Sequence, residues 1–132
     1  MFTKLSVISS VFLSTCLVSG CANHRAAAPR TALIGHVVFV ELNDSSEYDE
    51  LLADSDSMLA TIESVRTYSA GKHIDTGRSS VLNDYDLAIY LGFESVDDLA
   101  AYVADEQHVA FVNLWKPKLK ALRVYGIHDP SK

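Results

Sequence analysis

Tyr102 and His108 place a phenol and an imidazole six positions apart in the C-terminal part of the chain. The sequence predicts that His108 lies in the first turn of a helix, where the positive end of the helix dipole disfavours protonation and keeps the ring neutral near pH 7. A neutral imidazole can act as a general base, and a phenol can donate to the oxygen of a forming enolate or alkoxide. The alternative is purely structural: His108 fixes the junction of two helices, and Tyr102 is a core residue with a satisfied hydroxyl.

His36, Asp86 and Tyr90 are candidate pocket residues on two expected strands. His36 shares a strand face with Val38 and Val40, so it either lines a pocket or is hydrogen-bonded inside a barrel. Asp86 and Tyr90 share a face of another strand, where they either meet in one cavity or pair with polar groups across a dimer.

Four basic residues gather near the C-terminal end of the last expected helix, and these are Lys116, Lys118, Lys120 and Arg123. Cations at that position oppose the negative end of the helix dipole, which accounts for them without a ligand. The alternative is a site for an anionic molecule.

Other site chemistry has little support in the sequence. The five histidines lack the spacing of a helical metal pair, and Asp54-Ser55-Asp56 lacks the glycine and the distal glutamate of a calcium loop. Gly77-Arg78-Ser79-Ser80 lacks the lysine of a phosphate-binding loop. We therefore expect no intrinsic metal and no cofactor.

The N-terminus predicts a signal peptide over residues 1–20. Lys4 precedes an apolar run from Leu5 to Val18, which is too short for a membrane-spanning helix and is followed by small residues. Val18-Ser19-Gly20-Cys21 resembles the lipobox of bacterial lipoproteins, which implies cleavage before Cys21 and its acylation. The protein would then be lipid-anchored in the cell envelope with its domain outside the cytoplasm, at either the inner or the outer membrane. The alternative is an ordinary signal peptide followed by a chance cysteine.

The remaining chain predicts one domain on a tether. Residues 21–32 lack apolar periodicity and read as a linker, and the domain is expected over residues 33–130. Cys16 and Cys21 are the two cysteines, so this interpretation leaves no thiol for a disulfide, a metal or a nucleophile. With 17 acidic and 11 basic residues, nucleic-acid binding is not expected.

Apolar periodicity predicts four strands, over residues 34–42, 65–74, 85–93 and 122–128. Helices are expected over residues 48–62, after an N-cap at Ser95, and from a second cap at Asp105 to Pro117. The order is β-α-β-β-α-β, an α+β pattern of the ferredoxin-like kind. The first strand is apolar on both faces, which predicts a cover on each side.

The chain resembles the stress-responsive alpha/beta-barrel (Dabb) family. The segments that carry the resemblance are Gly35-His36-Val37-Val38, Tyr85-Asp86-Leu87-Ala88, Phe93-Glu94-Ser95 and the stretch from Tyr102 to Val109. The resemblance implies a ferredoxin-like domain that forms a homodimer by pairing two sheets into a closed barrel. The partner would cover the sheet face that the helices leave bare.

A plant polyketide cyclase of this family works without a cofactor, using a histidine and a tyrosine with the spacing of Tyr102 and His108. His36 resembles that enzyme's first-strand histidine, whereas a further pocket histidine corresponds to Asp86 here.

We therefore expect a lipid-anchored dimeric Dabb domain of unassigned chemistry that binds a small apolar or aromatic molecule. The alternative is a cofactor-independent cyclase, isomerase or monooxygenase with His108 as base and Tyr102 as donor. A third hypothesis is a purely structural dimer with a filled barrel.

Overall fold

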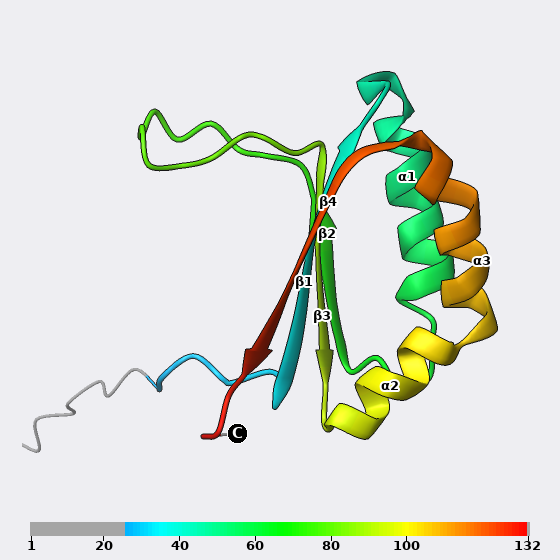
Figure 1. Ribbon diagram of the computed structural model, residues 1–132. Helices are drawn as coiled ribbons and strands as arrows, with labels where there is room; N and C mark the ends of the chain where they lie inside the picture. The colour runs from blue at the N-terminus through cyan, green and yellow to red at the C-terminus, as the bar shows by residue number, and fades with distance from the viewer. Residues whose placement is uncertain (1–25, 132) are drawn as a thin grey trace, which may run out of the picture.

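The computed structural model of the protein describes residues 26–131 (Figure 1). The expected signal peptide, Cys21 and the start of the tether lie outside the described residues. Within residues 26–131, no helix is both long and apolar enough to span a bilayer.

In the described part of the chain, four strands form one sheet, and three helices accompany it. The strands are β1 (Ile34–Leu42), β2 (Thr67–Gly71), β3 (Leu87–Phe93) and β4 (Leu119–His128). The helices are α1 (Tyr48–Asp54), which continues into a π-helical turn (Ser55–Leu59), α2 (Val96–Ala104) and α3 (Glu106–Trp115). Short 3-10 turns precede α1 and follow α3, at Ser45–Glu47 and Lys116–Lys118.

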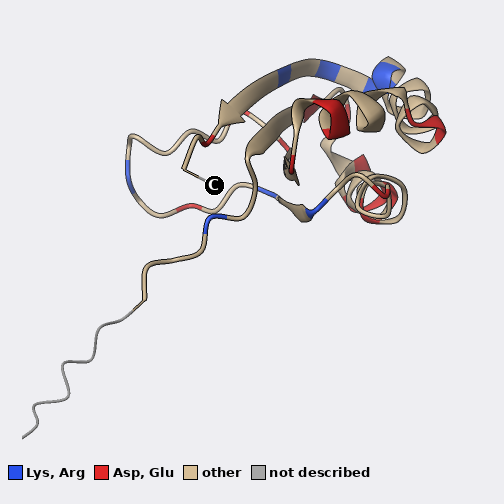
Figure 2. Ribbon diagram, turned by 90° about the horizontal axis from the view of Figure 1, so that it is seen from below, with Lys and Arg blue, Asp and Glu red and all other residues tan. Residues whose placement is uncertain are grey.

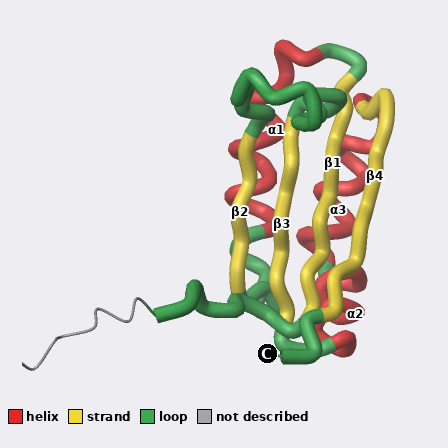
Figure 3. The backbone as a smooth tube through the Cα atoms, turned by 90° about the vertical axis from the view of Figure 1, so that its left-hand side faces the viewer, coloured by secondary structure: helices red, strands yellow, loops and turns green. Residues whose placement is uncertain are grey.

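The sheet is antiparallel throughout, with the strand order β2-β3-β1-β4. All three helices lie on one face of it, and the other face is bare (Figures 1 and 3). This is a ferredoxin-like α+β fold, as the sequence predicts.

The core lies between the sheet and the helices. Val40 pairs with Leu87 across β1 and β3, so their side chains share the helix-covered face, and both are buried. Leu51, Phe93 and Trp115 close the core from the helix layer and the sheet ends, each at most 1% exposed. Burying one large apolar side chain contributes about 1.5–3 kcal/mol, so each of these residues stabilises the contact between sheet and helices.

Both expected helix caps are confirmed. The Ser95 side chain accepts a hydrogen bond from the Asp98 amide at 3.0 Å, and the Asp105 side chain accepts one from the Gln107 amide at 2.8 Å. Asp105 has an extended backbone and separates α2 from α3. The break changes the chain direction between Tyr102 and His108.

Three strand boundaries differ from the expected ones. The second strand is shorter than predicted, because pairing between β2 and β3 ends at Gly71. β3 begins at Leu87, since the Leu42 amide donates to the Asp86 carboxylate at 2.7 Å instead of to a backbone carbonyl of the neighbouring strand. β4 begins at Leu119, directly after the 3-10 turn that contains Pro117, and pairs there with Leu42.

The bare sheet face, called the open face below, is apolar. Tyr125 and Ile127 on β4 are 54% and 50% exposed there, next to Val37 of β1. Gly35 and Gly92 are paired across β1 and β3, and the Tyr90 ring lies against both positions. The first strand is therefore apolar on both faces because one packs under the helices and the other lies on this surface.

The N-terminal segment is fixed to the end of the chain. Arg30 forms an ion pair with Asp129, whose amide donates to the Leu33 carbonyl at 2.8 Å. Ala32 is buried at 5% exposure. The domain therefore holds the chain from about residue 30 onward.

Candidate functional site

His36, Tyr102 and His108 line one small cavity between the sheet and the helices, with a volume of about 100 Å³. β1 supplies His36, the last turns of α2 supply Tyr102, and the first turn of α3 supplies His108. Its other lining residues are apolar, among them Ile89 and Leu91 of β3. The structure thus gathers three of the five candidate residues at one place.

The three rings form a contiguous group. The Tyr102 ring centroid lies 4.5 Å from that of His108 and 6.0 Å from that of His36. Tyr102 is 2% exposed and packs against Phe93 at 5.2 Å. Burial on this scale fixes the phenol between the two imidazoles.

The hydrogen bond of His108 defines its tautomer. Its Nδ1 lies 3.0 Å from the carbonyl oxygen of Val103 in the last turn of α2. A carbonyl oxygen can only accept, so Nδ1 carries the proton and donates it. In the neutral ring Nε2 is then unprotonated, and it can accept a hydrogen bond or a proton.

Burial sets the charge states of the other two rings. Desolvation lowers the pKa of His36, and the neighbouring His108 lowers it further. Desolvation raises the pKa of Tyr102 well above its usual value, so the phenol stays protonated and can donate. His36 is therefore neutral at pH 7, and Tyr102 offers an uncharged donor.

These polar groups are available to a bound molecule. Across the described part of the chain, no protein group forms a hydrogen bond with the Tyr102 hydroxyl or with the His36 ring. Buried polar groups are normally satisfied, so this arrangement suits a guest or a water molecule that bonds to them.

An apolar groove of about 420 Å³ continues from the cavity along α3 and β4. The two spaces share four lining residues, which are Val40, Phe111, Val112 and Leu122. Trp115 lies deeper in the groove, and Lys116 and Lys120 stand at its far end. Figure 2 shows basic segments along β4 and the turn before it, while acidic residues lie on the helices.

The sequence does not predict this groove. Its shape depends on how α3 packs beside the edge strand β4, and this packing leaves Val112 and Leu122 37% and 53% exposed. The sequence feature that lies near the groove is the lysine cluster, and its members differ in their ion pairs. Lys118 pairs with Glu47 at 2.7 Å, and Lys120 pairs with Glu41 at 2.6 Å. Lys116 forms no ion pair with any residue in 26–131.

Asp86 and Tyr90 lie away from the cavity. Asp86 precedes β3 and lines a separate polar space near the start of α1. Tyr90 lies on the open face, where its hydroxyl is 3.4 Å from the Thr31 hydroxyl. The structure therefore does not bring these two residues together with His36, and any role for them in binding stays a prediction.

Metal coordination has no visible basis in the described structure. Among residues 26–131, no group of three His, Cys, Asp or Glu side chains is arranged to hold a metal ion.

Several solved structures have the same fold. A Dabb-family protein with a ferredoxin-like fold from Mesorhizobium loti is 23% identical, with a TM-score of 0.62 over 73% of this chain and 95% of that one. A dimeric ferredoxin-like protein of unknown function from Thermobifida fusca is 19% identical, with a TM-score of 0.62 over 80% and 100%. The hydroxynitrile lyase of Passiflora edulis is 14% identical, with a TM-score of 0.65 over 78% and 98%.

At these identities the structural likeness establishes the fold alone. No curated protein matches the chain significantly. The family model for the Stress responsive A/B Barrel Domain matches residues 34–127, from the start of β1 to the penultimate residue of β4. The protein therefore belongs to the stress-responsive alpha/beta-barrel (Dabb) family.

Proposed function

We propose that this protein is a binding module that takes a small apolar or aromatic molecule into the cavity and the adjoining groove. The observation that carries the proposal is the group of three polar rings in an otherwise apolar space. Pockets for small molecules commonly have this composition, with a few polar groups that orient the ligand.

The dimensions require the ligand to occupy both spaces. A cavity of about 100 Å³ corresponds to roughly three water molecules at the volume each has in the liquid. The groove, at about 420 Å³, lies in the range of roughly 300–1,000 Å³ that ligand pockets have. A polar group would bind at His36, Tyr102 and His108, and the apolar part would extend past Val112.

Filling the groove tests this proposal. Val112→Trp adds bulk at a 37% exposed position that lines the groove, and Val109→Trp is the matched control at a 45% exposed position of the same helix that does not. Calorimetric titration with decanoate and with 1-decanol should show binding that Val112→Trp weakens at least about tenfold, equal to about 1.4 kcal/mol. If neither compound binds the folded protein, or if both variants bind equally well, the groove is not the site.

A second candidate function is cofactor-free acid–base catalysis, and the hydrogen bond between His108 and Val103 favours it. In this reaction His108 Nε2 would take a proton from a hydroxyl or an acidic carbon of the substrate. Tyr102 would donate to the substrate oxygen that gains charge, a combination that general acid–base catalysis requires. A fold neighbour is a hydroxynitrile lyase by name, so cyanohydrin cleavage is one reaction of this class.

Mandelonitrile provides a direct assay for the catalytic alternative. Loss of its hydroxyl proton to His108 would release cyanide and benzaldehyde, which is followed by absorbance. His108→Gln should lower the rate by about 10²-fold or more, as the loss of a general base does, whereas His128→Gln at an exposed site should not. A rate equal to the uncatalysed background, or one that is unchanged in His108→Gln, rejects this activity.

We also propose that the protein is a homodimer joined through its open face. The exposed Tyr125 and Ile127 support this, because contiguous apolar surface on a soluble domain usually marks an interface. The similar protein from Thermobifida fusca is described as dimeric. Sedimentation should give a dimer that Ile127→Lys dissociates, while Leu114→Lys on α3, 47% exposed, leaves the dimer intact. A monomer at all concentrations would refute this part.

The lipid anchor is the third part of the proposal. The sequence Val18-Ser19-Gly20-Cys21 supports acylation of Cys21 and a place in the bacterial envelope. Labelling in cells with a clickable palmitate analogue should mark the protein, and Cys21→Ala should abolish the label. Cys16→Ala is the matched control and should leave it unchanged. Equal labelling of all three proteins would reject Cys21 as the anchor.

A further inference from the structure

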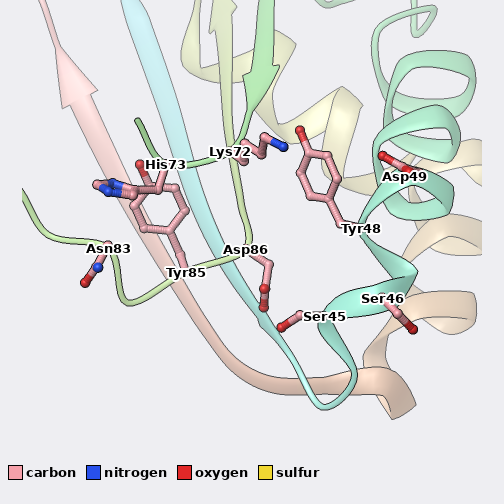
Figure 4. A pocket seen from close by; sticks show the side chains of 9 residues that line it. All are labelled: Ser45, Ser46, Tyr48, Asp49, Lys72, His73, Asn83, Tyr85 and Asp86. Carbon is pink, nitrogen blue, oxygen red and sulfur yellow. The ribbon is translucent and has the colours of Figure 1, made fainter. Parts of the chain in front are cut away.

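A polar cavity lies apart from the candidate site, where the start of α1 meets the connection between β2 and β3. Its volume is about 500 Å³, and it shares no lining residue with the cavity or the groove described above. Ser45, Tyr48 and Asp49 line it from the α1 side, and the opposite wall is lined by Lys72, His73, Asn83, Tyr85 and Asp86 (Figure 4). This volume lies within the usual range for small-molecule sites.

The cavity offers many hydrogen-bonding groups that the protein leaves unused. Within the described residues, no protein partner bonds to the Tyr48 and Tyr85 hydroxyls, the Asn83 amide or the Lys72 ammonium group. His73 Nδ1 is buried and also has no partner there. A buried nitrogen without a partner costs about 1–3 kcal/mol, so an external group that bonds to it would stabilise the structure.

The wall formed by residues 72–86 is held in place by the sheet. Arg123 of β4 bonds to the Asp84 carbonyl at 2.7 Å and forms an ion pair with its carboxylate at 3.1 Å. Tyr85 packs against Phe39 of β1, with ring centroids 4.9 Å apart. Connections of this length without secondary structure are uncommon and are often functional. This one is fixed at its C-terminal end, which holds Tyr85 and Asp86 in place at the cavity.

The distribution of charge identifies the class of ligand. Lys72 brings a positive charge, and Asp49 and Asp86 bring negative ones, so neither an anion nor a cation meets a uniform field. Asp86 uses one carboxylate oxygen for the Leu42 amide and retains the other. A set of donors and acceptors beside two phenol rings matches a molecule whose hydroxyls can each donate and accept.

We propose that this cavity is a second binding site, for a neutral, hydroxyl-rich molecule the size of one sugar unit. Lys72 lies over the Tyr48 ring, with Nζ 5.5 Å from the ring centroid, and with Asn83 it donates to ring hydroxyls. The free oxygen of Asp86 accepts from one hydroxyl, and the Tyr85 ring contacts the apolar edge of the sugar. The same chemistry is presented by a free monosaccharide and by one unit of a glycan chain.

Titration of the folded protein by ¹H–¹⁵N NMR tests the site with glucose, galactose, mannose, N-acetylglucosamine and chitotriose. We expect saturable shifts confined to residues 45–49 and 72–86 with at least one of these probes. Asn83→Ala and Lys72→Met should each weaken binding about 2- to 12-fold, the effect of losing one hydrogen bond of about 0.5–1.5 kcal/mol. Asn113→Ala and Lys116→Met, on exposed sites outside the cavity, are the matched controls.

The outcomes separate the two sources and can overturn the proposal. Chitotriose binding at least tenfold more tightly than N-acetylglucosamine supports a glycan chain, and comparable affinities support a free sugar. The proposal is wrong if no probe gives saturable shifts, if the control variants weaken binding as much, or if acetate or phosphate produces the same shifts.

Discussion

Replacing Gly92 by alanine should destabilise the protein, because this position in β3 has no room for a methyl group. A β-carbon built there would lie 2.2 Å from the Thr67 hydroxyl oxygen and 2.6 Å from the Ala32 β-carbon. Neither neighbour can yield easily, since Thr67 is β-branched within β2 and the Ala32 methyl group moves only with its backbone.

Two opposing contributions determine how much Gly92→Ala changes the free energy of unfolding. Overpacking of this kind costs about 1–3 kcal/mol, and removal of a glycine from a strand returns about 0.5–1 kcal/mol through the unfolded chain. We therefore expect Gly92→Ala to lower the free energy of unfolding by up to about 2.5 kcal/mol. Gly126→Ala in β4 is the matched control, because no atom lies within 4 Å of its added methyl group. It should be neutral or slightly stabilising.

Urea unfolding followed by the fluorescence of the buried Trp115 measures both variants. Each kcal/mol corresponds to a shift in Tm of about 4–8 °C for a domain of this size. A Gly92→Ala protein as stable as Gly126→Ala would show that the N-terminal segment does not pack against β3 as the structure places it.

Three further predictions concern individual side chains. Burial lowers the pKa of His36, so near pH 6.5 the unfolded state binds a proton more readily than the folded state does. The stability should therefore fall as the pH drops from 7 towards 5. Between these two pH values, Tm should fall less in His36→Phe than in the unchanged protein. Trp115→Phe loses the hydrogen bond from Nε1 to Asp54 at 3.0 Å together with buried surface, and should lower the free energy of unfolding by about 1–3 kcal/mol. Because this variant lacks the single tryptophan of the sequence, its unfolding in urea is followed by circular dichroism. Asp86→Ala leaves the Leu42 amide without its acceptor and should lower the free energy of unfolding by about 1–3 kcal/mol in the same measurement. Asp86→Asn keeps a carbonyl oxygen and should lower it less. If both variants lose the same amount of stability, Asp86 does not act as this acceptor.

The parts of the fold that depend on local signals could be predicted from the sequence. Ser95 and Asp105 cap their helices as expected, because an N-cap is a contact between residues two or three apart. The alternation in β3 also gives the correct buried face. Strand ends were less accurate, since the Asp86 carboxylate bonds to the distant Leu42 amide and β4 pairs with β1 directly after the turn that contains Pro117.

The candidate site could be predicted in part. His36 shares the helix-covered face with Val38, and the family resemblance supplied Tyr102 and His108, so these three were expected together. The alternation in β3 places Tyr90 on the face opposite Leu91, but the sequence does not show that the cavity lies on the helix-covered face and so excludes Tyr90. The groove and the polar cavity depend on the packing of α3 and of residues 72–86, for which no local pattern exists.

The ion pair between Arg30 and Asp129 limits the length of the linker between the domain and the proposed lipid anchor at Cys21. This ion pair attaches the chain to the domain at Arg30. At about 3.3–3.6 Å per residue, a fully extended chain from Cys21 to Arg30 would be at most about 30 Å long. This span is attached at the end of the sheet where β4 finishes, while residues 72–86 lie at the other end (Figure 1). With so short a linker, the polar cavity would face away from the bilayer and be accessible to molecules that are not bound to the membrane.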